Sequence, residues 1–250
     1  MSQHTLQGRT ESEVTWYQRR ETLKAAAAWI AMGGMPAAMA QSRSNIVDLV
    51  GDVLVNGERL VREQIIQTGD QIVSGPASRL VFMLGNAAFH VRQNSQLTVE
   101  RGRSINTMSL LRLLGGAVVS VFGPSSYRAI STPTLTAGIR GTGVYTEVMA
   151  AQGGRTYFCN CYGRVELERA GQNVLSQSVY HQSFWGEAEP KGGRYITPAG
   201  AINHTDEELE FLAQLIDQRT AWQIMGKKGI KDGRGFMEPQ GEGMHPAYPR

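Results

Sequence analysis

Apolar and polar residues alternate with the period of a β-strand along most of the chain between residues 41 and 198. The segments QLTVE (96–100) and GRVELE (163–168) place every second side chain on one face, which is typical of half-buried strands. The segment RLVFML (79–84) is apolar on both faces, so we expect that strand to be covered on both sides. An Asn56-Gly57 pair between apolar residues predicts a hairpin turn. The pattern therefore predicts a mainly β domain.

A second hairpin is predicted around the only two cysteines of the chain. The segment TEVMAAQGGRTYF carries Gly153 and Gly154 at its centre, where a turn would return the chain. Residues 144–150 should then lie beside the strand that carries Cys159 and Cys161. Short strands at regular spacing, with no repeat of fixed period, are consistent with a sandwich, a barrel or a twisted β-solenoid.

The pattern changes to that of a helix after residue 198. Thr205 and Glu208 have the spacing of a capping box, which predicts a helix from Asp206 to about residue 219. Its apolar stripe should pack on the β domain and consists of Leu209, Leu212 and Ile216. From residue 226 onward the chain is rich in glycine and proline with few apolar anchors, so we expect residues 226–250 to be a disordered tail.

The composition fits one globular domain with tails. The chain has 250 residues, of which 41% are hydrophobic, and this is enough for one core. The net charge of +3 is small and is not concentrated in a basic stripe, so the sequence does not indicate a nucleic-acid partner. The expected organisation is an N-terminal signal (1–40), a β domain (41–198), a helix packed on it (199–225) and the tail (226–250).

The N-terminal region has the form of an export signal of the twin-arginine type. An apolar run from residue 25 to 35 follows its charged start and is too short to span a bilayer. The small-x-small sequence Ala38-Met39-Ala40 is the expected cleavage site. The residues that match the signal pattern are Arg19, Arg20, Leu23 and Lys24.

Cleavage after Ala40 would start the mature chain at Gln41 in the periplasm. Residues 1–40 contain four cationic and three acidic side chains, so the net charge would change from +3 to +2. The alternative is an uncleaved signal that anchors the chain in the inner membrane. No later segment is long and apolar enough to cross a membrane. A protein or another component of the cell envelope is the expected partner.

Four segments in a fixed order resemble the FecR domain family, over about residues 47–185. The first runs from the Asn56-Gly57 turn through Gly69-Asp70 to the strand QLTVE. The others are LRLLGGAVVSVF (111–122), STPTLTAGIRGTGVYTEV (131–148) and CNCYGRVELE (159–168).

The resemblance implies a periplasmic β domain that takes part in signalling, since known members of the family regulate iron uptake across the membrane. Those members carry a cytoplasmic anti-sigma region before a membrane segment. Only 18 residues precede Arg19 here, and no C-terminal signalling lobe is evident. The resemblance therefore implies a free FecR-type module that binds, senses or scaffolds. It is similar in particular to members that combine Cys-x-Cys-Tyr-Gly with a later His-Thr-Asp and a short helix.

Cys159 and Cys161 are separated by one residue and should share one face of a strand. Three interpretations remain open: free thiols in the core, a strained disulfide, and a metal or haem-like site. Residues i and i+2 of a regular strand are about 6.5–7 Å apart, which is too far for an unstrained disulfide. Two thiolates on one metal ion need sulfurs only about 4 Å apart. A bulge at Gly163 would weaken this argument.

Histidine is the natural additional ligand for a metal bound to cysteine. His181 lies on a predicted strand soon after the cysteine strand, and His204 directly precedes the predicted N-cap, where the helix dipole favours a neutral imidazole. The sequence therefore predicts a Cys₂His₂ set of Cys159, Cys161, His181 and His204 for zinc, iron or copper. In the alternative function, the cysteine pair is a redox-active or metal-cofactor working centre.

Catalytic patterns are not evident in the sequence. Arg140-Gly141-Thr142-Gly143 lacks the strand–helix context of a phosphate loop. The acidic residues 206–208 are typical of a helix start, and we find no Ser-His-acid order and no HExxH motif. We therefore expect a binding, sensing or scaffold module and not an enzyme.

Overall fold

The structure is a computed structural model that describes residues 44–102, 108–124 and 128–235. The predicted signal, its cleavage site and residues 236–250 lie outside these described residues. Within them, no helix is long and apolar enough to cross a membrane.

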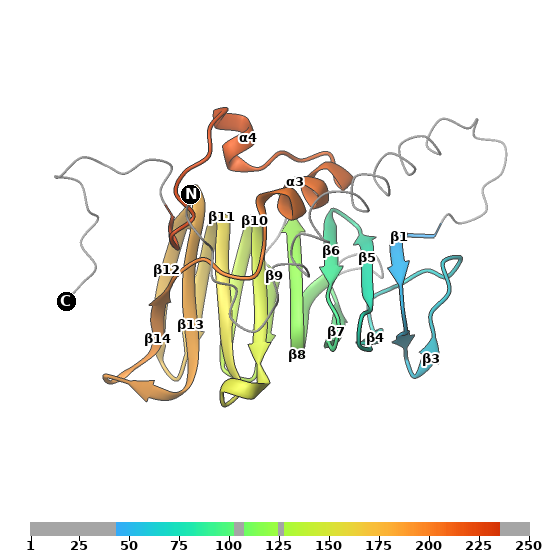
Figure 1. The fold of residues 1–250 in the computed structure, drawn as a ribbon, viewed down its shortest axis with the longest axis horizontal. Coiled ribbons are helices and arrows are strands. Elements are labelled where there is room, and N and C mark those ends of the chain that lie inside the picture. The colour runs from blue at the N-terminus through green and yellow to red at the C-terminus, as the bar shows by residue number, and fades with distance from the viewer. Residues whose placement is uncertain (1–43, 103–107, 125–127, 236–250) are drawn as a thin grey trace.

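The described chain is mainly β, as the sequence predicts, and its strands form one continuous antiparallel sheet apart from the parallel pair β8–β9 (Figure 1). The strands are β1 (Ile46–Val50), β2 (Val53–Val55), β3 (Glu58–Arg59), β4 (Gln71–Ser74), β5 (Arg79–Leu84), β6 (Ala87–Val91), β7 (Gln96–Arg101), β8 (Met108–Phe122), β9 (Arg128–Thr132), β10 (Leu135–Met149), β11 (Arg155–Arg169), β12 (Gln172–Ser178), β13 (Tyr180–Lys191), β14 (Arg194–Ala199) and β15 (Arg234–Gly235). The helices are the 3₁₀ helix η1 (Ala150–Gln152), α3 (Asp206–Leu215) and α4 (Ala221–Met225).

The strands follow the order β14-β13-β11-β10-β9-β8-β7-β4-β2-β3, with β6, β5 and β1 branching from β8. Both predicted hairpins are present, because Asn56-Gly57 joins β2 to β3 and η1 with Gly153-Gly154 joins β10 to β11. Three strands are longer than the short strands we expected: β8, β10 and β11 have 15 residues each. Strand β8 runs through Gly115-Gly116, and Gly116 adopts a left-handed φ of 74° beside a register shift in the pairing with β7, a conformation that glycine takes without strain.

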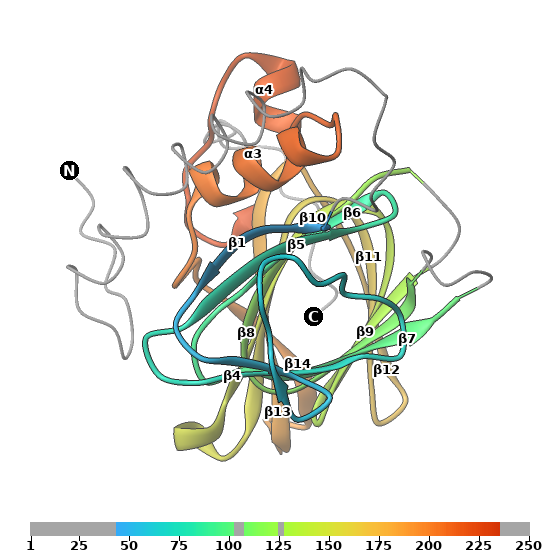
Figure 2. The same ribbon diagram turned by 90° about the vertical axis from the view of Figure 1, so that its right-hand side faces the viewer.

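The sheet buries apolar side chains on both faces. It curls around a first cluster that includes Phe82, Phe89, Leu111 and Phe158 (Figure 2). A second cluster lies between the other face of the sheet and the helices, and it includes both cysteines together with Leu209 and Leu212 of α3. The functional candidates therefore lie in the layer that the helices cover.

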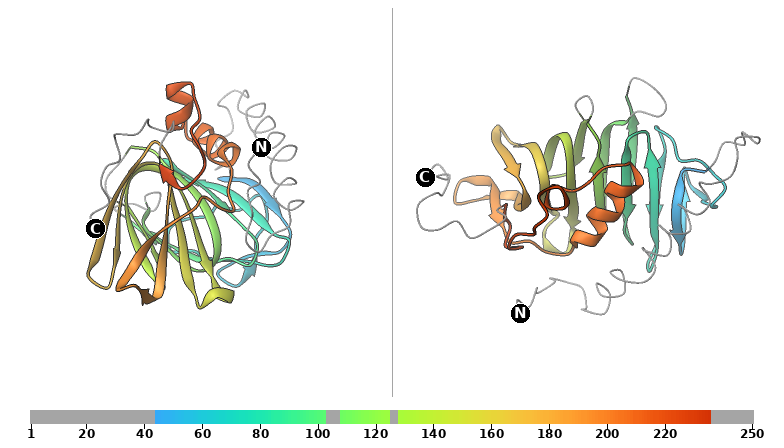
Figure 3. Two further views of the ribbon diagram at one scale, coloured as in Figure 1. Left: turned by 60° about the vertical axis from the view of Figure 1, so that its left-hand side comes forward. Right: turned by 90° about the horizontal axis from the view of Figure 1, so that it is seen from above.

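Helix α3 begins at Asp206 behind the predicted capping box, in which Thr205 and Glu208 each hydrogen-bond the other's backbone N–H. It ends at Leu215, earlier than expected, and a second short helix, α4, follows behind a capping box of its own at Thr220. Viewed from above, α3 lies across the strands (Figure 3). The predicted stripe is buried at Leu209 and Leu212.

The composition predicts a disordered tail over residues 226–250, but residues 226–235 are part of the fold. Strand β15 pairs with β13, and Lys231 contacts the carbonyl oxygen of His204. This segment has few apolar side chains to hold it. Backbone pairing and polar lysine contacts attach it to the domain instead. We call residues 226–235 the C-terminal strap.

Candidate metal centre

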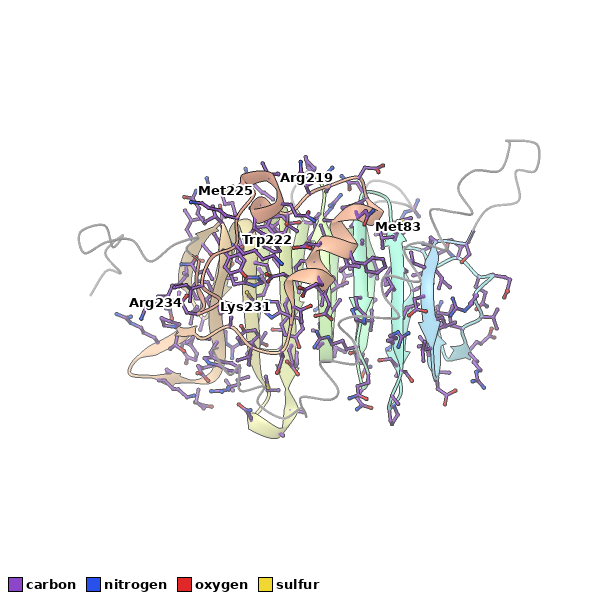
Figure 4. The ribbon with its side chains drawn as sticks, turned by 45° about the horizontal axis from the view of Figure 1, so that its top comes forward. Met83, Arg219, Trp222, Met225, Lys231 and Arg234 are labelled. Atoms are coloured by element: carbon purple, nitrogen blue, oxygen red, sulfur yellow. The ribbon has the colours of Figure 1, made fainter. Side chains whose placement is uncertain are left out.

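The structure brings Cys159, Cys161, His181 and His204 together in the layer between the sheet and the helices. All four are buried, and one ligand atom from each lies within 4.8 Å of the others. They come from β11, β13 and the loop before α3, so only the tertiary fold unites them. Trp222 and Lys231 lie over this part of the sheet (Figure 4).

Cys159 and Cys161 share a side of β11 at a β-bulge. Val144 of β10 pairs with Asn160, and the preceding Gly143 pairs with Tyr162, so Cys161 is the extra residue. The bulge brings the two Sγ atoms to 3.7 Å, and both thiols are free. Gly163 follows at φ 101°, and a Cβ there would lie 2.6 Å from Cγ2 of Thr142. Glycine is therefore required next to the bulge.

His181 is the extra residue of a second bulge, on β13. Tyr180 pairs with Gly235 and Gln182 pairs with Arg234, which leaves His181 unpaired with a φ of 51°. A left-handed backbone is uncommon for a residue other than glycine, and it turns the imidazole toward the cysteines. Nδ1 of His181 lies 3.6 Å from Sγ of Cys159.

His204 reaches the cluster from the loop before α3. The preceding Asn203 has a φ of 61°, and Thr205, the N-cap of α3, follows. Nε2 of His204 lies 3.4 Å from Sγ of Cys161 and 2.9 Å from Nδ1 of His181. Irregular backbone thus accompanies three of the four ligand positions, which is typical of functional sites.

The spacing of the four atoms is close to that of a tetrahedral metal site. For zinc, ligand bonds of about 2.3 Å to sulfur and 2.05 Å to nitrogen place two sulfurs about 3.8 Å apart and sulfur and nitrogen about 3.6 Å apart. The observed S–S distance is 3.7 Å, and the S–N distances are 3.6 Å from Cys159 to His181 and 3.4 Å from Cys161 to His204. The N–N distance of 2.9 Å is shorter than the expected value of about 3.3 Å.

Hydrogen bonds on the outer side of each imidazole decide which nitrogen carries the proton. Nε2 of His181 lies 2.9 Å from Oδ1 of Asp206, and Nδ1 of His204 lies 2.6 Å from the carbonyl oxygen of Ile202. Both partners accept hydrogen bonds, so these nitrogens donate. In the neutral rings, the lone pairs of the other two nitrogens therefore face the cluster, as metal ligation requires.

Burial and the neighbouring groups shift the pKa values of the two thiols in opposite directions. Burial raises the pKa of Cys161, and the hydrogen bond and charge of Cys159 raise it further. Burial also acts to raise the pKa of Cys159, but the hydrogen bond from Cys161 and the two imidazoles outweigh it and hold that pKa well below the usual value. Burial lowers the pKa of His204, which favours the neutral ring. Two cysteine sulfurs and two imidazole nitrogens are a strong ligand set for a soft or borderline metal ion once the thiols have lost their protons.

Aromatic rings and the C-terminal strap close the cluster. The indole of Trp222 stacks on His181 with ring centroids 5.3 Å apart, and Tyr145 stacks on His204 at 4.8 Å. Lys231 lies 3.6 Å from Oδ1 of Asp206. Among the described residues, the four ligand residues are therefore all buried beneath protein.

Sequence reasoning missed the residues that support the four ligands. It assigned Asp206 to the helix start, although its carboxylate also accepts hydrogen bonds from His181 and Tyr180. Its position two residues after His204 was the available signal. Nothing in the sequence indicated Tyr145 or Trp222, because only the fold brings them to the cluster.

Comparison with known proteins adds little. No family model matches the chain and no curated protein matches it, so the FecR resemblance stays a prediction. Two solved structures described as a "putative anti-sigma factor from Parabacteroides distasonis ATCC 8503" are similar, with 10% and 9% identity and TM-scores of 0.43 and 0.44. They cover 58% and 54% of this chain, which in turn spans 64% and 60% of theirs. A similarity this distant supports no conclusion about function.

Proposed function

We propose that the chain is a non-catalytic binding or sensing module whose β domain holds one zinc ion at Cys159, Cys161, His181 and His204. The observation that carries the proposal is the convergence of four buried ligand atoms, one from each of these residues, within 4.8 Å of one another. The outer nitrogens of both rings donate to protein acceptors. In the neutral rings, both nitrogens that face the cluster then offer a lone pair to a cation that the two sulfurs can also bind.

Charge balance favours a divalent ion over copper(I). Two thiolates, two neutral imidazoles and one divalent ion sum to zero, and a neutral group is the least costly charge state in a buried site. Copper(I) with the same ligands would leave one uncompensated negative charge. Zinc also accepts tetrahedral Cys₂His₂ ligation without a geometric penalty.

Four protein ligands in a closed site indicate a structural role for the ion. A catalytic zinc keeps one position open for water or substrate, whereas here the fourth position belongs to protein. The ion would join β11, β13 and the loop before α3. It would thus fasten the helices and the C-terminal strap to the sheet, which suits a module whose surface recognises a partner.

Export to the periplasm remains part of the proposal. The twin-arginine-type signal supports it, because that route carries folded proteins and a metal could be inserted before export. The partner would then be a protein or another component of the cell envelope.

The second candidate function is a redox centre formed by Cys159 and Cys161. The 3.7 Å S–S distance and the lowered pKa of Cys159 favour it. Oxidation would remove two electrons and two protons from the thiols, and a separate disulfide or other two-electron oxidant would have to accept them. The sulfurs would also have to approach to about 2.0 Å, which requires the bulge to rearrange.

One experiment separates the two functions. The chain is exported with its own signal, purified without chelator, and examined by intact mass and by metal analysis. One equivalent of zinc supports the proposal, whereas a mass two protons light without metal supports the disulfide. Less than a tenth of an equivalent of any metal, with both thiols free to alkylate, would overturn both.

Variants locate the ion. Cys159→Ser/Cys161→Ser and His204→Gln should each lose the metal. Asp70→Asn is the control, because Asp70 is also a buried polar residue but lies outside the cluster and bonds Asn56 and Gln67. Retention of zinc by the double serine variant would contradict the assignment.

A further inference from the structure

Arg92 connects the N-terminal half of the sheet to the loop that carries His204. It directly follows β6, and its side chain is buried. Nη2 lies 2.7 Å from both carboxylate oxygens of Glu208 in α3. Nη1 donates a hydrogen bond to the backbone carbonyl of Asn203. One guanidinium thus contacts the residue before His204 and the first turn of α3.

Asn203 needs such support because its backbone is left-handed at φ 61°. Its side-chain amide donates to Oε2 of Glu147 at 2.8 Å, and Arg92 holds its carbonyl oxygen. These two contacts fix the peptide that leads into His204. The loop cannot relax to an ordinary backbone conformation without breaking them.

Tyr145 adds a second connection between the same residues. Its ring stacks on His204 at an interplanar angle of 17°, and the guanidinium carbon of Arg92 lies 5.0 Å from its centroid. Its hydroxyl donates to Oε2 of Glu147 at 2.6 Å. Arg92, Tyr145 and His204 therefore form one continuous stack.

We infer that Arg92 is a positioning residue for the metal centre: it fixes the His204 loop and so sets the affinity for the ion without touching it. This inference rests on the proposed zinc site. The fork of an arginine suits the role, because one planar group can bind both carboxylate oxygens of Glu208 while a second nitrogen binds Asn203. A lysine has a single ammonium and cannot hold the same set of acceptors.

The test uses the full exported chain and two variants. Arg92→Lys keeps the charge beside Glu208 but gives up the fork. Arg92→Met/Glu208→Gln removes the buried charge pair, and the glutamine can still accept the capping bond from the Thr205 N–H. Arg79→Met is the matched control, because Arg79 is also buried and contacts Asp48 at 2.6 Å, away from the cluster.

Zinc affinity is measured by competition with a coloured chelator, and the cobalt(II) absorption spectrum reports ligand geometry. Outer contacts of this kind typically change metal affinity by about 10–100-fold. We expect Arg92→Lys to weaken zinc binding about tenfold and the double variant to weaken it more. Both should shift the cobalt bands, whereas Arg79→Met should alter stability alone.

The outcomes separate this inference from the proposed function. If the natural chain binds no zinc, the zinc site itself is wrong. If it binds zinc and Arg92→Lys binds equally tightly with an unchanged cobalt spectrum, the role of Arg92 is wrong and the site stands. If the double variant does not fold, the zinc affinity and cobalt spectrum of Arg92→Lys alone decide whether Arg92 positions His204.

Discussion

Replacement of Trp222 by alanine should detach the C-terminal strap from the domain more often and expose the metal centre to solvent. Trp222 is 2% exposed, and its ring contacts Tyr162, Tyr180 and His181 at centroid distances of 5.3–5.5 Å. Truncation of a buried tryptophan costs about 3–5 kcal/mol. The hydrogen bond from Nε1 to Glu210 contributes about another 1 kcal/mol.

This loss should appear as local opening, because Trp222 is the one buried residue of α4, which leads directly into the strap. A change of about 1.4 kcal/mol corresponds to a factor of ten in an equilibrium. A loss of about 3 kcal/mol or more therefore predicts at least a roughly hundredfold larger open population, unless opening already dominates.

Limited trypsin digestion at Lys227 and Lys228 measures this population, since cleavage of an opened segment follows its equilibrium when reclosing is fast. Zinc transfer to an excess of chelator measures the same opening at the metal. Ile224→Ala is the control on the same helix, because Ile224 is 68% exposed. If trypsin cleavage and zinc transfer are no faster in Trp222→Ala than in the natural chain, this ring does not shield the metal centre from solvent.

Three further outcomes are expected. Burial acts to raise the pKa of Glu208, but the charge of Arg92 outweighs it and holds the pKa well below the usual range. The stabilisation is then present above about pH 4.3 and is lost as the pH falls, so acid should weaken the natural chain more than Glu208→Gln in urea unfolding. Gly163→Ala should lower both stability and zinc content, because a Cβ would lie 2.6 Å from Thr142 and φ is 101°; a normal melting temperature and full zinc would contradict the bulge geometry. Removal of zinc with a chelator should lower the melting temperature, and at a zinc concentration of 1,000 times Kd the ion stabilises the fold by about 4.1 kcal/mol. Equal melting of the two forms in calorimetry would show that the ion does not bind the folded state preferentially.

The sequence predicted local structure well where the signal was short-range. The Asn56-Gly57 and Gly153-Gly154 hairpins depend on turn residues, and the start of α3 depends on a capping box between Thr205 and Glu208. It predicted the lengths of β8 and α3 less well. Strand β8 runs to 15 residues where short strands were expected, and α3 ends before the predicted limit.

The strap was missed for a different reason. Residues 226–235 have few apolar side chains, and composition alone therefore indicated disorder. Their position depends on backbone hydrogen bonds to β13 and on the contacts of Lys228 and Lys231 with Asp206. Strand β13 and Asp206 are about 20 or more residues away in the sequence, so the local composition of the strap does not reveal these contacts.

The sequence by itself determined a mainly β chain, its hairpins, the capped helix and the four residues with the chemistry of metal ligands. Only the tertiary structure decided that these four meet, because β11, β13 and the loop before α3 must pack before their side chains can converge. The tertiary structure also decided the bulges at Cys161 and His181. It likewise decided the contacts of Arg92, Tyr145 and Trp222 with the cluster. They arise from contacts between residues far apart in the chain, which residue type and local spacing do not specify.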